Sequence, residues 1–346
     1  MIVDATPKPY PVSPLSNQTT DAHGKDSQDK TGRLACASCP PQAATARDTP
    51  AGTTVRFAAI SDIHHFPHAR LPPAIAFWKL SEHALSSVRE FKSSLARGGF
   101  KFGINLGDSV EDDSGVDSAS IDGQNISEVV NALENDLPIY YAIGNHDTVN
   151  NSPDTLSRIT GCKPYYSFNE GAFHFIVLHS VADASNPENT LIPETQLNWL
   201  KSDLQENRSR PTVVFLHHAL SERSVAGNHW FEPNPKQAFV KNRAEVRDIF
   251  KESGNVCLVM NGHLHDNNVW QDEDDQTLYI TLQSATENIG NNTPANAWAD
   301  VQLAKEGVSM RVLGNDPRTY EYEFPARIQN IFPASQLPSD TKTRAA

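Results

Sequence analysis

The sequence predicts a layered α/β domain of the α+β type, built on a mixed sheet or on paired sheets. Three observations support this prediction. Short apolar runs alternate with segments of helical periodicity from residue 55 to residue 260, the following 50 or so residues contain mainly strand-like runs, and polar motifs follow the ends of the predicted strands. Alternating strands and helices are typical of sheets covered by helices, and such sheets bind ligands beyond the carboxyl ends of their strands.

The first half of the domain is predicted to contain three strands and two helices. Residues 55–60 (VRFAAI) form an apolar run of strand length. Residues 77–95 keep their apolar side chains at helical spacing, and Gly98-Gly99 ends that helix. By the same criteria we expect a strand over 100–106, a helix over 126–137 and a strand over 138–143.

The second half continues the alternation and then changes character. We expect a helix over 193–205 because Pro193 stands at its start, where proline is favoured. After residue 260 the pattern contains mainly β-strands. The expected elements are strands over 173–178, 212–216 and 256–260, helices over 193–205 and 236–251, and strands over 269–270, 278–282, 298–303 and 308–313.

Composition divides the chain into three parts. Residues 1–51 are rich in Pro, Ser, Thr and Asp, so we expect a disordered or extended N-terminal arm in which Cys36 and Cys39 are two thiols. We expect residues 52–315 to form one folded domain and residues 316–346 to form a C-terminal tail. Neither a transmembrane run nor a basic leader is visible, so we expect a cytoplasmic protein with no membrane partner. An exported form is the alternative, because a removed leader would leave no trace here.

The formal net charge of −13 limits the class of partner. An acidic surface repels long nucleic acids and anionic membranes. It does not exclude small phosphate esters, because the charge of a bound metal outweighs a distant acidic surface. We interpret the acidic runs at 111–113 and 272–275 as solvated loops.

Five short polar motifs follow apolar runs, and together they indicate a site for two divalent metals. Carboxylate, amide and imidazole groups are the ligands of such centres. Side chains two residues apart in an extended segment point the same way, so each D-x-H or H-x-H pair can bind one ion. Asp108 stands alone at its strand end and is our choice for a carboxylate that bridges both ions. The motifs are Asp62-Ile63-His64, Gly107-Asp108, Gly144-Asn145-His146-Asp147, His217-His218 and Gly262-His263-Leu264-His265.

The order of these motifs resembles that of the calcineurin-like metallophosphoesterases. The segments 165–168, 173–178 and 196–200 are similar to the middle of the cyclic-nucleotide phosphodiesterases and ADP-ribose/CDP-alcohol diphosphatases of that family. The diphosphatase relatives tend to have glutamine where His64 stands, which favours them less. The resemblance implies a β-sandwich flanked by helices and a dinuclear centre. It also implies the roles of the ligands, with Asp108 as the bridge. Asp62, His64 and His265 would bind the first metal, and Asn145, His217 and His263 the second.

The resemblance leaves the metals open among Mn, Fe, Zn and Co. Purple acid phosphatases carry a tyrosine where Glu111 stands, so an iron–tyrosinate centre is not expected. His218 is the alternative to His217. His146 would face the leaving-group oxygen as acid or hydrogen-bond donor, and Asp147 would orient it, although Asp147 could instead cap a turn.

Two further histidines are candidates for binding substrate. His65 directly follows a ligand and could reach the phosphate. His229 precedes Trp230 and Phe231 in a long polar stretch, where these rings could form a pocket wall that stacks on a base. The competing interpretation is an ordinary loop with an anchoring aromatic residue.

We therefore expect a metal-dependent phosphoric ester hydrolase that acts through a metal-bridging hydroxide. Small phosphate esters are the expected substrates, and the resemblance favours a nucleotide phosphodiesterase or diphosphatase. The alternatives are a broad-range phosphomonoesterase and a catalytically silent scaffold with the same fold. The sequence does not determine the oligomeric state.

Overall fold

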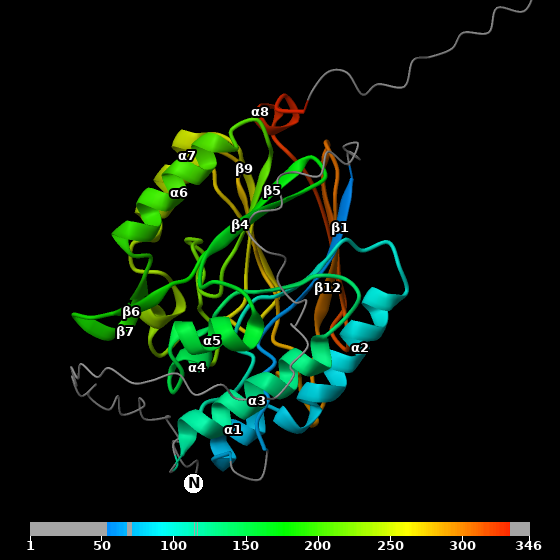
Figure 1. Cartoon of the computed structure of the whole chain (residues 1–346), viewed down its shortest axis with the longest axis vertical. Coiled ribbons are helices and arrows are strands. Elements are labelled where there is room, and N and C mark those ends of the chain that lie inside the picture. The colour runs from blue at the N-terminus through cyan, green and yellow to red at the C-terminus, as the bar shows by residue number, and fades with distance from the viewer. Residues whose placement is uncertain (1–53, 68–70, 114, 116, 333–346) are drawn as a thin grey trace, which may run out of the picture.

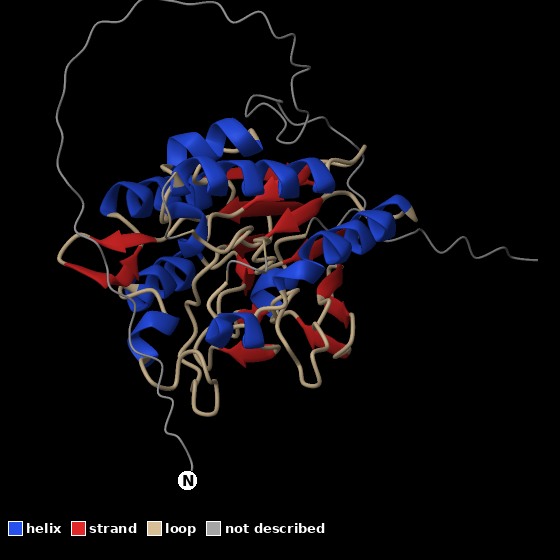
Figure 2. Cartoon of the chain, turned by 90° about the horizontal axis from the view of Figure 1, so that it is seen from below, coloured by secondary structure: helices blue, strands red, loops and turns tan. Residues whose placement is uncertain are grey.

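The structure, a computed structural model, describes residues 54–67, 71–113, 115 and 117–332. Two six-stranded sheets face each other, and helices flank them (Figures 1 and 2). A small two-stranded sheet projects from this body. The predicted layered α/β class, in its two-sheet form, is confirmed.

Each large sheet combines strands from distant parts of the chain. The first has the order β14 (Arg318–Glu323), β13 (Gly307–Leu313), β12 (Trp298–Leu303), β1 (Val55–Ile60), β2 (Gly103–Asn105) and β3 (Ile139–Tyr141). The second has the order β10 (Asn268–Gln271), β11 (Leu278–Thr281), β9 (Val256–Asn261), β8 (Thr212–Phe215), β5 (Phe173–Val177) and β4 (Tyr166–Glu170). The small sheet is the hairpin of β6 (Val181–Asp183) and β7 (Asn186–Leu191).

Parallel pairing in the middle of both sheets determines where the site forms. Strands β1, β2 and β3 are parallel neighbours, and so are β5, β8, β9 and β11. Parallel neighbours end at the same edge of a sheet, where α/β proteins bind their ligands. The polar motifs that follow β1, β2, β3, β8 and β9 are therefore delivered to one region.

The hydrophobic core lies between the two sheets. Phe57 of β1 contacts Phe175 and Phe215 of the opposite sheet, with ring centroids 6.0 and 5.4 Å apart. Side chains alternate along β8, so Val214 points the other way and packs in a second apolar cluster with helix residues such as Phe250. Because both faces of β8 are buried, its sequence is a continuous apolar run rather than an alternating one.

The helices flank the sheets. Helices α6 and α7 lie against the sheet that contains β9, on the side away from β1 (Figure 1). The helical elements are α1 (Pro73–Trp78), the 3₁₀ helix η2 (Ser81–His83), α2 (Ala84–Ala96), α3 (Ser118–Leu133), α4 (Asn145–Thr148), α5 (Pro153–Thr160), α6 (Glu194–Glu206), the 3₁₀ helix η3 (Pro235–Ala238), α7 (Arg243–Ser253) and α8 (Ala326–Gln329).

The helix expected over 77–95 is interrupted. Lys79 forms an isolated antiparallel bridge with Glu287, and the Leu80 amide donates to the Thr286 carbonyl. This pairing with a distant segment takes the backbone out of the helix, which resumes at Ala84. Local periodicity does not report such a tertiary contact.

The folded part of the chain extends past the expected boundary at residue 315. Strand β14 pairs antiparallel with β13, and α8 follows it. Ile328 and Phe332 are buried, and the Arg327 guanidinium donates to the carbonyls of Gly254 and Val256. The alternating tyrosines of RTYEYE indicate a strand, although charged residues surround them.

Other expectations fall outside the described residues. These are the extended arm over 1–51 with Cys36 and Cys39, and residues 333–346 of the expected tail. Among the described residues, none of the helices combines the length and apolar character needed to cross a bilayer.

Candidate metal centre

Five of the seven predicted metal ligands have a left-handed backbone. The φ angles are 50° at Asp62, 45° at His64, 52° at Asp108, 67° at His263 and 55° at His265. Such angles are uncommon for residues other than glycine and concentrate at functional sites. The pairs Asp62/His64 and His263/His265 therefore converge through tight turns, and not through the extended geometry that we expected.

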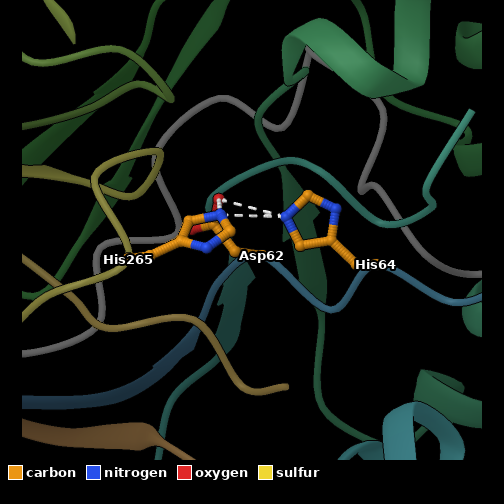
Figure 3. A group of neighbouring side chains, drawn as sticks. All are labelled: Asp62, His64 and His265. Atoms are coloured by element: carbon orange, nitrogen blue, oxygen red, sulfur yellow. Dashed lines mark hydrogen bonds and ion pairs between the residues drawn. The ribbon is translucent and has the colours of Figure 1, made fainter. Parts of the chain in front are cut away.

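The first predicted ligand group is assembled and buried. Figure 3 shows Asp62, His64 and His265 directed toward one another. The Nε2 atom of His265 lies 3.2 Å from Asp62 Oδ1 and 3.0 Å from His64 Nε2. Because two ring nitrogens and a carboxylate oxygen converge, these residues can hold one metal ion.

The second group lies beside the first and is joined to it by Asp108. His217 Nε2 lies 3.2 Å and His64 Nε2 lies 3.8 Å from Asp108 Oδ2. Asp108, His217 and His263 also form a potential ligand group. The Oδ1 atom of Asn145 is buried without a hydrogen-bond partner among the described residues, as a ligand oxygen would be. These contacts fit Asp108 as a bridge between two metal ions.

Each ligand histidine presents one ring nitrogen to the centre because another group faces the second nitrogen. Glu111 lies 2.9 Å from His64 Nδ1, and Glu287 lies 2.7 Å from His265 Nδ1. Backbone carbonyls face the other two rings, Leu106 O at 3.0 Å from His217 Nδ1 and Gln237 O at 2.9 Å from His263 Nε2. Carboxylates and carbonyls of this kind fix the tautomer and the orientation of metal-binding histidines.

The alternative between His217 and His218 is decided by geometry. His218 is buried, and its Nδ1 atom lies 2.7 Å from Ser180 Oγ. His217 is the one whose Nε2 atom faces Asp108. The structure therefore favours His217 as the ligand.

Two glycines allow the ligand loops to approach one another. A Cβ atom on Gly144 would lie 2.0 Å from Asp108 Oδ1, and one on Gly262 would lie 2.4 Å from Asp62 Oδ2. Real atoms do not approach so closely, so any larger residue would displace a ligand carboxylate. The glycines of the motifs are therefore explained by the space that the metal centre requires.

His146 is placed as expected, but its partner is not Asp147. His146 Nε2 lies 4.0 Å from Asp108 Oδ2, and its Nδ1 lies 2.5 Å from Asp112 Oδ1. Burial opposes protonation, but the charges of Glu111 and Asp108 and the hydrogen bond to Asp112 together outweigh it and raise the pKa of His146 to about 9. The imidazole can therefore carry a proton at neutral pH.

Asp147 has a different task from the expected one. Its carboxylate accepts hydrogen bonds from the backbone amides of Gly144, Asp108 and Ser109, at 2.8–3.0 Å. It ties the loop after β2 to the first turn of α4. This corrects its assignment as the orienter of His146 and agrees with the capping alternative. The structure gives the orienting position to Asp112.

The two candidate substrate residues differ. His65 Nε2 lies 2.7 Å from Glu128, which pairs it with helix α3. His229 is exposed at the edge of the centre, where it stacks on Trp78 at a centroid distance of 3.9 Å and lies 3.2 Å from Glu287. These contacts place His229, but not His65, beside an acid that orients a metal ligand.

The aromatic neighbours of His229 cover the ligand histidines. The Trp230 ring lies 5.5 Å from that of His265, and the Phe231 ring lies 4.6 Å from that of His263. Trp78, the last residue of α1, reaches the same region. Trp230 Nε1 also donates to Glu287 at 3.2 Å, which fits the competing interpretation of a loop anchored by an aromatic residue, so the pocket wall stays a prediction.

Several important residues were not predicted. Glu111 belongs to an acidic run that we interpreted as a solvated loop, but it is buried. Its position three residues after Asp108 was the only signal in the sequence. Glu287, Asp112 and Lys79 reach the centre through tertiary contacts that no local pattern records.

Glu287→Gln is predicted to weaken metal binding by about 10- to 100-fold, the usual cost of losing a group that orients a ligand histidine. The change removes the negative charge that faces His265 Nδ1. Isothermal titration with Mn²⁺ measures the effect. Asp203→Asn is the matched control, because it alters a His–carboxylate pair of the same 2.7 Å length whose histidine, His174, is not a predicted ligand. Equal affinities in the two variants would contradict the role of Glu287.

The ligand histidines differ in protonation before metal binds. Burial and the charge of Lys79 lower the pKa of His64 to about 4, and burial with His217 lowers that of His263 to about 3. Burial also opposes protonation of His217 and His265. The charges and hydrogen bonds of their partners, mainly Asp108 for His217 and Asp62 with Glu287 for His265, together outweigh it and raise their pKa values to about 8 and about 9. Two of the four ligand rings are therefore protonated at pH 7.

Metal binding is accordingly predicted to release one to two protons per chain at pH 7. A metal binds the neutral imidazole, so protons compete with it. Affinity should fall as the pH falls from 9 to 6, and the release should vanish above the pKa of His265. Titration of Mn²⁺ in two buffers of different ionisation enthalpy counts the protons. A binding enthalpy that is the same in both buffers at pH 7 would contradict this prediction.

Two apposed sheets, with paired groups of buried carboxylate and imidazole ligands at the carboxyl ends of their parallel strands, define a dinuclear metal-binding α/β protein. The chain belongs to the calcineurin-like phosphoesterase family, whose model matches residues 55–267. This family of metal-dependent phosphoester hydrolases is the one that the motifs resemble.

Individual relatives are similar at low identity. The chain is 27% identical over 197 residues to the bovine serine/threonine-protein phosphatase CPPED1, covering 55% of this chain and 59% of that protein. It is 27% identical over 143 residues to a 3′,5′-cyclic-nucleotide phosphodiesterase of Nostoc sp., covering 41% of this chain and 49% of that protein. The matches thus span about half of each curated relative.

The solved structure of a dimetal phosphatase from Danio rerio has the same fold. Its TM-score with this chain is 0.62 at 16% identity, and the alignment covers 78% of this chain and 99% of that one. At this identity the likeness establishes the architecture alone.

Proposed function

We propose that this protein hydrolyses phosphodiester or diphosphate bonds of small molecules, with nucleotides as the main class. The observation that carries the proposal is the pair of ligand groups joined by Asp108, with His146 Nε2 directed to the same place at 4.0 Å. Two cations bound there would neutralise phosphoryl oxygens and activate a water between them. The donor set of carboxylate, amide and imidazole suits Mn, Fe, Zn or Co.

The chain's own residues supply the remaining parts. His146 is held by Asp112 with its Nε2 toward the centre, where it can donate a hydrogen bond to the leaving-group oxygen. Trp230 and Phe231 lie beside ligand rings, 5.5 Å from His265 and 4.6 Å from His263, where they would keep water away from them. His229 and Trp78 offer aromatic faces at the rim, where a base can stack.

Charge balance favours a diester over a monoester. A monoester carries close to two negative charges at neutral pH, whereas a diester carries one. The buried acids Glu111 and Glu287 lie beside the ligands, and the ammonium of Lys79, 2.6 Å from Glu111, sets one positive charge against their two negative charges. A singly charged phosphate therefore meets less repulsion. The name of the Nostoc relative agrees with this choice, while the name of the bovine relative agrees with the monoesterase alternative.

Paired assays of bis- and mono-p-nitrophenyl phosphate with Mn²⁺ test the proposal. We expect a higher kcat/KM for the diester. A higher value for the monoester would replace the proposal with a phosphomonoesterase. An inactive protein that retains two bound metals would instead indicate a catalytically silent scaffold.

A further inference from the structure

The ammonium of Lys79 is buried within the metal centre. Its side chain is 4% exposed, although lysine is almost never fully buried unless it is paired. The antiparallel bridge between Lys79 and Glu287 fixes its backbone beside the acid that faces His265. The fold therefore interrupts a predicted helix to place a cation here.

Lys79 contacts both Glu111, the acid that faces His64, and His146. Its Nζ atom lies 2.6 Å from Glu111 Oε2, the same oxygen that lies 2.9 Å from His64 Nδ1. It also lies 3.3 Å from His146 Nε2, the nitrogen that faces Asp108. The ammonium is 5.2 Å from the centre of the Trp230 ring, which covers it.

Compensation of the charge on Glu111 explains why Lys79 is buried, but not why it lies toward His146. A counter-ion for Glu111 could approach that carboxylate from any side. Lys79 lies on the side where His146 Nε2 and the bridging carboxylate come together. A phosphoryl group in reach of both ligand groups and of His146 would be adjacent to this ammonium.

We propose that Lys79 binds a non-bridging phosphoryl oxygen of the substrate. Binding of a phosphoryl oxygen would redirect the N–H that faces His146 Nε2 at 3.3 Å, while the contact with Glu111 is kept. It would add a fixed positive charge where negative charge must be stabilised during phosphoryl transfer. This inference rests on the proposed function, because it assigns the reacting phosphoryl group to the centre next to Lys79.

Binding of inorganic phosphate to the metal-saturated full-length chain tests this role without turnover. We expect Lys79→Met to weaken phosphate binding by about 10- to 100-fold, which corresponds to the loss of one charge-assisted hydrogen bond. Lys79→Arg keeps the charge and should retain most of the affinity. Lys241→Met is the matched control, because Lys241 Nζ also lies 2.6 Å from a carboxylate, that of Asp183, on the β6–β7 hairpin. Its phosphate affinity should be unchanged.

A second pair of variants separates phosphate binding from charge compensation. If Lys79 only neutralises Glu111, then Glu111→Gln and the double variant Lys79→Met/Glu111→Gln bind phosphate equally, with metal content matched by measurement. Our proposal instead expects the double variant to bind about 10-fold more weakly or worse. Equal phosphate affinities of Glu111→Gln and the double variant would overturn the proposal. This comparison remains a test even if the single variant Lys79→Met does not fold.

Failure of the proposed role of Lys79 can be distinguished from failure of the proposed function. A wild-type chain that binds phosphate but hydrolyses neither ester would contradict the function alone. A chain that hydrolyses the diester while Lys79→Met keeps full phosphate affinity would contradict the role of Lys79 alone.

Discussion

Asp108→Ala is expected to lower kcat/KM for the diester by roughly 10³-fold or more, because a bound metal supplies several kcal/mol of transition-state stabilisation. Asp108 is the carboxylate whose Oδ2 atom faces both His64 and His217. Without it the two ligand groups lose their shared member. We therefore expect metal content to fall from two ions to one or none, measured by inductively coupled plasma mass spectrometry on the purified protein.

The control for this variant is a buried carboxylate outside the centre. Asp300 is buried on β12 and pairs with Arg56 at 2.8 Å. Asp300→Ala should lower thermal stability but keep two metals and the activity of the folded fraction. Full metal content and activity in Asp108→Ala would show that Asp108 does not bridge the metals.

His146→Ala is expected to lower kcat by about 10²- to 10⁴-fold, the usual contribution of a general acid or base. Unlike Asp108→Ala, it should keep both metals. The loss should grow as the leaving group becomes more basic, because a poor leaving group depends more on a donated hydrogen bond. Rates on a series of phosphodiesters with leaving groups of increasing pKa measure this trend.

The contacts of His146 leave one competing role that the same variant tests. His146 also lies within ligand distance of His64 and Asp108, so it could bind a metal. A fall in metal content in His146→Ala, with an equal loss for every leaving group, would support that role over acid catalysis. His174→Ala is a control, since His174 pairs with Asp203 at 2.7 Å outside the centre.

The sequence predicted those features that depend on local pattern. Strands β1, β8 and β9 are continuous apolar runs, β2 lies in the run predicted over 100–106, and the residues after these four strands are the first groups that can face a shared edge. Asp62, Asp108, His217 and His263 could therefore be assigned to one centre before any coordinates. The two-sheet arrangement followed from the family resemblance, and not from periodicity.

Other features depend on contacts between distant segments, which no window of sequence contains. Glu287 is 22 residues from His265 in the chain, yet the two are in contact. Lys79 reaches Glu111 because its segment bridges to Glu287 and leaves the helix. Asp147 was predicted to orient its neighbour His146. It stands instead at the third position of helix α4, where its carboxylate faces back to the amide of Gly144 at the start of that helix. Asp112, from another loop, takes the place beside the imidazole.

A crystal structure of the Mn²⁺-loaded chain, with anomalous scattering recorded at the metal edge, tests the central claim most directly. The account predicts two anomalous peaks about 3.5–4 Å apart. Asp108 should contact both ions, Asp62 and His265 should contact one, and Asn145 and His217 should contact the other. A single ion, or two ions that do not share Asp108, would contradict the account.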